Sequence, residues 1–117
     1  MKTVSFIILI SLFLGCQNSS TLSKNIVAQN SPEENAKAKT LFTVCQRCHG
    51  EKAELHALTK SDIIAYYSRD DIMQALTSYQ KGQRDRHRFG YLMKGIVSDL
   101  SPYEINILAN YISKLKD

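Results

Sequence analysis

The sequence predicts a small all-α domain, and three observations carry this prediction. Ser31, Ser68 and Ser101 each stand three residues before an acidic residue, which is the capping-box pattern of a helix start. Apolar residues downstream of these serines recur every three or four positions, as on the buried face of a helix. No stretch sustains the polar–apolar alternation of a strand. In 117 residues we therefore expect one domain of about four helices.

The first two expected helices lie on either side of a cysteine-containing segment. Ser31 can cap the first helix, Pro32 suits its first position, and the helix should run to about Arg47. A second start is expected at Ser61, next to an aspartate, leading into residues 63–67.

The last two expected helices have the clearest apolar faces. A third helix should begin after Ser68 and end before Gly82, where a charged loop follows over residues 81–91. The fourth starts at Ser101, again with proline in the first position. The apolar faces comprise Ile72, Ala75, Leu76 and Tyr79 in the third helix, and Ile105, Leu108, Ala109, Ile112 and Leu115 in the fourth.

The N-terminal segment is typical of an exported protein. After Lys2, residues 4–14 are nearly all apolar, a run too short to span a bilayer but suited to a signal peptide. The run ends in Leu14-Gly15-Cys16, which resembles the lipobox of bacterial lipoproteins. We therefore expect a signal peptide over residues 1–15 and lipidation of Cys16. The alternative is ordinary cleavage a few residues later, which would discard Cys16.

A polar segment separates this N-terminus from the helices. Residues 16–31 are rich in Ser, Asn, Gln and Thr, a composition typical of a flexible tether with a reach of roughly 20 Å. The folded domain is then expected over residues 32–117. Acyl chains on Cys16 would hold it at the periplasmic side of the membrane, and without them it would be soluble in the periplasm.

The net charge of +4 is moderate. A basic protein can bind nucleic acid, an anionic membrane or an acidic protein partner. No nucleic-acid module is recognisable, and the export signal argues against one, so we expect no nucleic-acid binding.

The strongest chemical signal is Cys45-Gln46-Arg47-Cys48-His49, a C-x-x-C-H motif. Two thiols three positions apart at a helix end can reach the two vinyl groups of one haem and form thioethers. The next residue, His49, can then supply an imidazole nitrogen to the iron. The motif therefore predicts one covalently bound haem c, held by Cys45 and Cys48 and ligated by His49.

Two other interpretations of the cysteine pair are weaker. A zinc site would need further ligands, and His56 or His87 would have to complete it at a spacing unlike that of zinc fingers. A redox dithiol usually lies in a βαβ setting, and no strands are evident.

A second axial ligand to the haem iron is commonly a methionine, which raises the reduction potential. Met73 and Met93 are the candidates, with His56 and His87 as competitors. Met73 lies in the third expected helix, where core packing is the simpler role. Met93 follows the irregular loop and precedes the last helix.

At this point the sequence resembles small bacterial class I cytochromes c. The resemblance rests on Phe42 three residues before the first cysteine, on the C-x-x-C-H-G run at 45–50, and on the closing pattern L-S-x-x-E-I-x-x-L-A-x-Y-I at 100–112. It covers about residues 35–116. In the family the methionine ligand lies eight residues before the serine of the closing pattern, which implies Met93 here. It also implies that the first and last helices cross with Phe42 and Tyr111 in contact.

The resemblance implies a monomeric one-electron carrier rather than an enzyme. With His49 and Met93 both bound, the iron has no open position for a substrate, and the domain would shuttle electrons between membrane-bound redox partners, a reductase and an oxidase. Basic residues at 81–88 would steer it to acidic patches on them, or would simply form a solvated loop. The alternative function is a haem-based gas sensor with an open or displaceable sixth position.

Overall fold

The computed structural model describes residues 29–117, and the regular secondary structure of this part of the chain is all helical, without strands. The expected signal peptide, Cys16 and most of the expected tether lie outside the described residues. Four α-helices are present: α1 (Pro32–His49), α2 (Arg69–Gln80), α3 (Gly90–Val97) and α4 (Pro102–Ile112). Short 3-10 helices cover Ala57–Thr59, Ile64–Tyr66 and Arg86–Arg88. None of the helices in residues 29–117 combines the length and apolar character needed to cross a membrane.

The three capping boxes that the sequence predicts are all formed. Ser31, Ser68 and Ser101 each accept a hydrogen bond from the backbone N–H of the acidic residue three positions on, whose carboxylate accepts the serine N–H in return. Each box satisfies backbone donors that have no partner inside the helix. The starts of α1, α2 and α4 are therefore fixed by local sequence.

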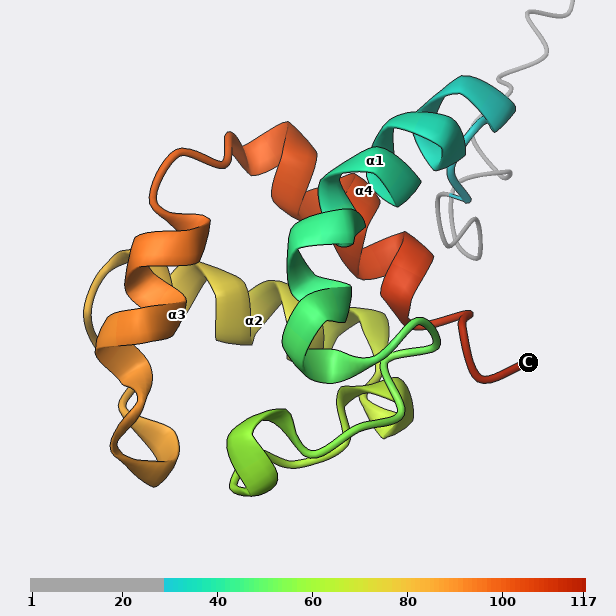
Figure 1. Ribbon diagram of the computed structural model, residues 1–117. Helices are drawn as coiled ribbons and strands as arrows, with labels where there is room; N and C mark the ends of the chain where they lie inside the picture. Colours follow the sequence, from blue (N-terminus) through green and yellow to red (C-terminus); the bar gives the residue numbers. More distant parts are fainter. Residues whose placement is uncertain (1–28) are drawn as a thin grey trace, which may run out of the picture.

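Helix α1 ends where the chain must turn sharply. Gly50 follows it with a φ of +86°, a conformation that side-chain-bearing residues rarely adopt. A Cβ at this position would also meet the Glu54 carboxylate, which would have to move aside. This glycine sends the chain from the end of α1 into the loop below it (Figure 1).

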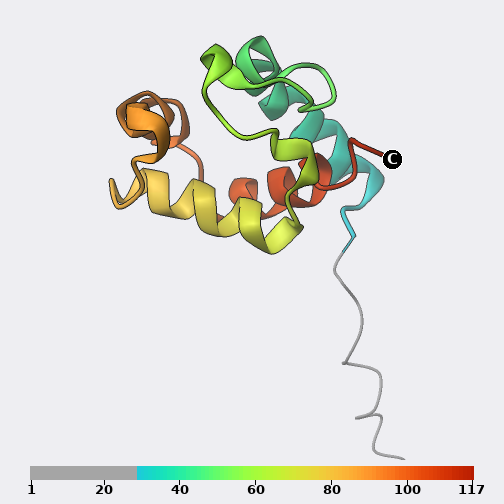
Figure 2. The same ribbon diagram turned by 90° about the horizontal axis from the view of Figure 1, so that it is seen from below.

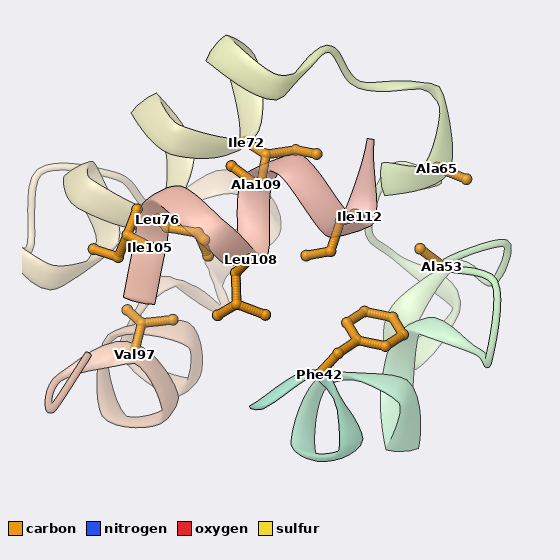
Figure 3. Close-up of a cluster of buried hydrophobic side chains, with 10 residues drawn as sticks. All are labelled: Phe42, Ala53, Ala65, Ile72, Leu76, Val97, Ile105, Leu108, Ala109 and Ile112. Carbon is orange, nitrogen blue, oxygen red and sulfur yellow. The ribbon is translucent and has the colours of Figure 1, made fainter. Parts of the chain in front are cut away.

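The core is built around α4. Figure 1 shows α1 crossing α4, and Figure 2, seen from below, shows α2 running beside it. Figure 3 shows Phe42 of α1 and Val97 of α3 directed toward the apolar face of α4 from one side, with α2 packed on the other. The buried cluster consists of Phe42, Ala53, Ala65, Ile72, Leu76, Val97, Ile105, Leu108, Ala109 and Ile112.

The contact expected between the first and last helices is confirmed. The rings of Phe42 and Tyr111 lie 5.7 Å apart between centroids, tilted by 57°. A second link ties the start of the fold to α4: the Asn30 amide donates to the Ile107 carbonyl, and Asn110 donates to Asn30. The two ends of the described chain are thus joined through α4.

Replacing Phe42 with alanine should remove about 3–5 kcal/mol of unfolding free energy, because the ring is 1% exposed and fills the α1–α4 crossing. Chemical denaturation of the haem-loaded protein measures this change. Tyr66→Ala is the control, since that aromatic side chain is 73% exposed and its loss should change stability by less than about 0.5 kcal/mol. Equal effects of the two substitutions would contradict this account of the core.

The prediction of a helix that starts at Ser61 is wrong. The Ser61 hydroxyl accepts a bond from the Ala57 N–H behind it and donates to the Asp62 carbonyl, so it caps no helix ahead of it. The Asp62 carboxylate accepts a bond from the Tyr67 hydroxyl. Ser68 already begins α2, which leaves room for a single 3-10 turn only.

The loop expected over residues 81–91 is shorter than predicted, and Met93 lies inside a helix. Helix α3 begins at Gly90, without a capping side chain at the position before it. Instead, Asp85 reaches forward and accepts the Gly90 N–H at 2.8 Å. The sequence does not predict this helix because it contains two glycines, which disfavour helices, and because its capping residue is not directly before it. Its position depends on packing against α2.

Candidate functional site

One cavity of about 270 Å³ opens between the end of α1, the loop before α2, α2 itself, and α3 with the loop before it. Its walls are largely apolar. Cys45, Cys48, His49 and Met93 all line it. The structure therefore brings together the four residues that the sequence predicts to hold and ligate a haem.

The two cysteines lie on the last turn and a half of α1. Both thiols are free; Cys45 is half-buried and Cys48 is exposed. Burial raises the pKa of Cys45 to about 11, so its thiol is protonated at neutral pH. Because both side chains line the same cavity, they can hold one bound group at its edge.

His49 is the last residue of α1 and is only 8% exposed. Its Nδ1 atom is buried without a hydrogen-bond partner in the described part of the chain. Burial also lowers the pKa of His49, which keeps the imidazole neutral, the form that binds a metal ion. A buried imidazole without a partner is costly, so this side chain fits a role as ligand to a group that protein atoms do not supply.

The two candidate methionines lie in different surroundings. Met93 lines the cavity from α3, while Met73 packs against the core and does not line the cavity. Of the competing histidines, His56 bonds through Nδ1 to the Ser61 carbonyl and lies outside the cavity lining. His87 does line it. Within residues 29–117 no group of three or more His, Cys, Asp or Glu side chains is placed to hold a metal ion.

The apolar wall of the cavity is unusually exposed. Val44, Leu58, Leu92 and Ile96 line it and are between 40% and 52% exposed. Large apolar side chains gathered at one opening usually mark a binding site. The flat apolar macrocycle of a haem would cover such a wall, so these residues fit the cofactor that the cysteine motif predicts.

A polar cluster joins the two loops at the mouth of this cavity. The Asp62 carboxylate accepts a bond from the Tyr67 hydroxyl at 2.7 Å and pairs with the Arg86 guanidinium at 3.0 Å. Arg86 also donates to the Tyr67 oxygen at 3.1 Å, and His87 Nε2 lies 3.8 Å from Asp62. We call Asp62, Tyr67, Arg86 and His87 the loop latch. It links residues about twenty positions apart in the sequence.

The latch changes the ionisation of two of its members. The Tyr67 hydrogen bond, helped by Arg86, lowers the pKa of Asp62 below its usual value. Burial, with the same hydrogen bond, raises the pKa of Tyr67. Non-glycine residues with positive φ occur in both joined loops, at Leu58 (51°) and His87 (59°). Such backbone is costly and persists where surrounding contacts hold it.

Asp62→Asn should lower the unfolding free energy at pH 7 by up to about 1 kcal/mol, since the ion pair is half exposed and screened. The folded-state pKa of Asp62 lies below the unfolded value of about 3.9. The contribution is therefore present above that unfolded value and is lost as pH falls through the lower folded-state pKa. Denaturation of both proteins at pH 7 and near pH 3 should show the difference shrinking in acid.

The matched control is Asp117→Asn, an acidic residue at the exposed C-terminus. It should leave the stability unchanged at both pH values. A difference between the Asp62 variant and the parent that stays constant from pH 7 to pH 3 would count against an ionised Asp62 in the latch.

Sequence patterns did not reveal several lining residues. Asp62 and Tyr67 lie in the segment that the sequence predicts to be the second helix. Tyr79 is predicted to be one apolar position on the amphipathic face of the third helix. Arg84 and Arg86 stand in a basic run, and the sequence leaves open which of its arginines, or Tyr79, would contact the haem propionates. All of these line the cavity. No local pattern marks them, because their roles arise from contacts between two loops.

Comparisons with known proteins point to one family. The sequence model of the family described as Cytochrome c matches residues 35–116. The chain is 35% identical to cytochrome c-553 of Helicobacter pylori strain J99 / ATCC 700824 over 78 residues, which cover 67% of this chain and 77% of that protein. Cytochrome c-553 of Helicobacter pylori strain ATCC 700392 / 26695 gives the same identity and coverage. No solved structure matches the chain.

Proposed function

The chain belongs to the cytochrome c family of small monohaem proteins, and on this premise we propose that it carries single electrons in an exported respiratory chain. Haem c, when bound, supplies an iron that alternates between ferrous and ferric states. The observation that carries the proposal is that His49 and Met93 line one cavity from two different helices, beside both cysteines.

The C-terminal end of α1 holds the cofactor. Cys45 and Cys48 would hold a haem c covalently through Sγ, and His49 would supply an imidazole nitrogen to its iron. Burial lowers the pKa of the His49 imidazole and so favours the neutral ring, which would need no proton loss before it binds a metal ion. All three residues lie at the end of one helix, which would keep their relative positions as the iron changes oxidation state.

Met93, which lines the cavity from α3, would supply the second ligand to the iron of a bound haem. Its thioether is uncharged and would serve both oxidation states. With His49 and Met93 both bound to it, the iron would have no position free for a substrate or a gas. This favours an electron carrier over the sensor alternative and over an enzyme.

The test is a redox titration of the haem-loaded protein combined with exposure of the ferrous form to carbon monoxide. We expect a reversible one-electron transition, sharp low-spin bands in the reduced spectrum, and no rapid change on adding the gas. A high-spin spectrum that shifts at once with carbon monoxide would mean an open sixth position, and the protein would then be a gas-binding sensor.

Redox partners would meet the domain near the cavity mouth. The cavity-lining residues of α3 and of the loop before it have three exposed cations near them in the sequence, Lys81, Arg88 and Lys94. Arg86 and His87 instead face Asp62 inside the loop latch. The exposed cations steer the domain toward an acidic surface on a reductase or oxidase. Electron-transfer rates should then fall as ionic strength rises, and a rate that does not change with salt would contradict steering.

The N-terminus anchors the domain to the periplasmic side of the membrane. In this proposal residues 1–15 are removed, Cys16 is lipidated, and residues 16–31 tether the domain over residues 32–117. Cys16→Ser should move the mature haem protein from the membrane fraction to the soluble periplasmic fraction. The parent protein in the soluble fraction would instead indicate ordinary cleavage without a lipid.

A further inference from the structure

Helix α3 carries Met93, yet its own sequence does little to hold it in place. The helix has eight residues, too few to be stable in isolation, and two of them are glycines. No side chain caps it from the position directly before it. Figure 1 shows α3 beside the C-terminal part of α2, against which it packs. The position of α3 therefore depends on contacts from outside the helix.

One side chain holds each end of α3. At its start, Asp85 accepts the Gly90 N–H at 2.8 Å. At its other end, the side-chain amide of Gln80, the last residue of α2, donates to the carbonyls of Val97 at 2.6 Å and Leu100 at 2.7 Å. Carbonyls at a helix end lack a full set of partners within the helix, so this amide supplies part of what is missing. The end of α2 is thus tied to the end of α3.

Gln80 acts on the cavity only through α3. Its side chain is half-buried and is not among those that line the cavity. Met93, Leu92 and Ile96 do line it, all from α3. Val97 follows them, is 1% exposed and points toward α4 (Figure 3). The amide therefore bonds α3 at its core end, while the residues before that end form part of the cavity wall.

We propose that Gln80 is a positioning residue for Met93: its amide ties α3 to α2 and so sets how readily the methionine leaves the haem iron. The inference rests on the proposed function and goes beyond it by naming the residue that keeps the sixth position closed. A movement of α3 away from the cavity must break both hydrogen bonds, because they start from a helix whose Ile72 and Leu76 are buried in the core. Removing the bonds lowers the cost of that movement and raises the population of the open form.

The test measures how tightly imidazole binds to the ferric, haem-loaded protein, because an added ligand binds only where Met93 has left. In Gln80→Glu the side chain keeps nearly the same shape, but its carboxylate accepts hydrogen bonds and cannot donate them. The apparent affinity for imidazole should rise roughly tenfold or more, as expected when two neutral hydrogen bonds of the closed form are lost. Without imidazole, the weak long-wavelength absorption band of a methionine–iron bond should remain.

Two further variants separate the hydrogen bonds from the added charge. Gln80→Lys should bind imidazole within about threefold of the parent, since an ammonium of similar reach has three N–H donors and suits a helix C-terminus. Gln74→Glu makes the same change as Gln80→Glu on the same helix, at an exposed position, and should leave the affinity unchanged. Denaturation of each protein shows whether stability and imidazole affinity change independently.

Equal imidazole affinity in the parent and in Gln80→Glu would overturn the inference, even if the variant were less stable, because Gln80 would then support the fold alone. An equal rise in Gln74→Glu would also overturn it, since the added charge would be the cause. If Gln80→Glu does not mature, Gln80→Ser decides by the same measurement, because a short hydroxyl cannot reach both carbonyls. A parent without covalent haem or without the methionine–iron band would contradict the proposed function itself, and the inference with it.

Discussion

Protein with both Cys45 and Cys48 replaced by alanine should carry no covalent haem after maturation in a haem-attachment system. The thiols are the atoms that form the two thioethers, and both line the cavity with free sulfur atoms. The measurement is haem retention on a denaturing gel, where only covalently bound haem stays with the chain. We expect complete loss in the double variant and partial retention in each single variant.

Loss of the haem should also reduce the amount of folded protein. The cavity wall includes Val44, Leu58, Leu92 and Ile96, which remain partly exposed when no cofactor covers them. A domain of this size buries a modest core, so the apolar surface of the cofactor is a large share of what folding buries. Circular dichroism should show little cooperative unfolding in the double variant. Covalent haem remaining in that variant would disprove attachment through Cys45 and Cys48.

Met93→Ala should convert the closed haem into an open one. The ferric protein should lose the weak long-wavelength absorption band of a methionine–iron bond, and the ferrous protein should bind carbon monoxide rapidly. The reduction potential should also fall, since a thioether ligand raises it and axial ligands as a class move haem potentials over about 0.8 V. The optical spectrum, the gas-binding rate and the redox titration measure the three effects.

Met73→Ala is the matched control, because Met73 packs on the core outside the cavity. It should lower the unfolding free energy by about 2–5 kcal/mol at most and leave the long-wavelength band in place. If the band disappears in the Met73 variant and persists in the Met93 variant, the ligand assignment is wrong. A low-spin parent protein that lacks the band would indicate a histidine ligand, with His87 the cavity-lining candidate.

The sequence alone predicts the elements that depend on short-range chemistry. A capping box involves two residues three positions apart, so it does not depend on tertiary contacts. Helix starts at Ser31, Ser68 and Ser101 can therefore be predicted from local sequence. The Cys45–His49 run is similarly local, since one helix end carries all three functional atoms. The closing pattern also implied the contact between Phe42 and Tyr111, which the structure confirms.

The tertiary structure decided what happens in the two loops around the cavity. Ser61 looks like a helix cap in the sequence, but its hydroxyl bonds backward to Ala57. Helix α3 begins at a glycine because Asp85 supplies the cap from five residues away and α2 supplies the packing. Local propensity is weak beside such contacts.

The roles of the arginines are the clearest case of this division. Arg84 and Arg86 are two positions apart in one basic run, and the sequence alone does not distinguish their roles. In the folded chain Asp62, more than twenty residues earlier, forms an ion pair with Arg86, while Arg84 lies against the Tyr79 ring and forms no ion pair within residues 29–117. The energy of a charge depends on which partner folding brings within a few ångströms and on how far water is excluded. The sequence therefore determined that the loop is basic, and only the fold determined which of its arginines forms an ion pair with Asp62.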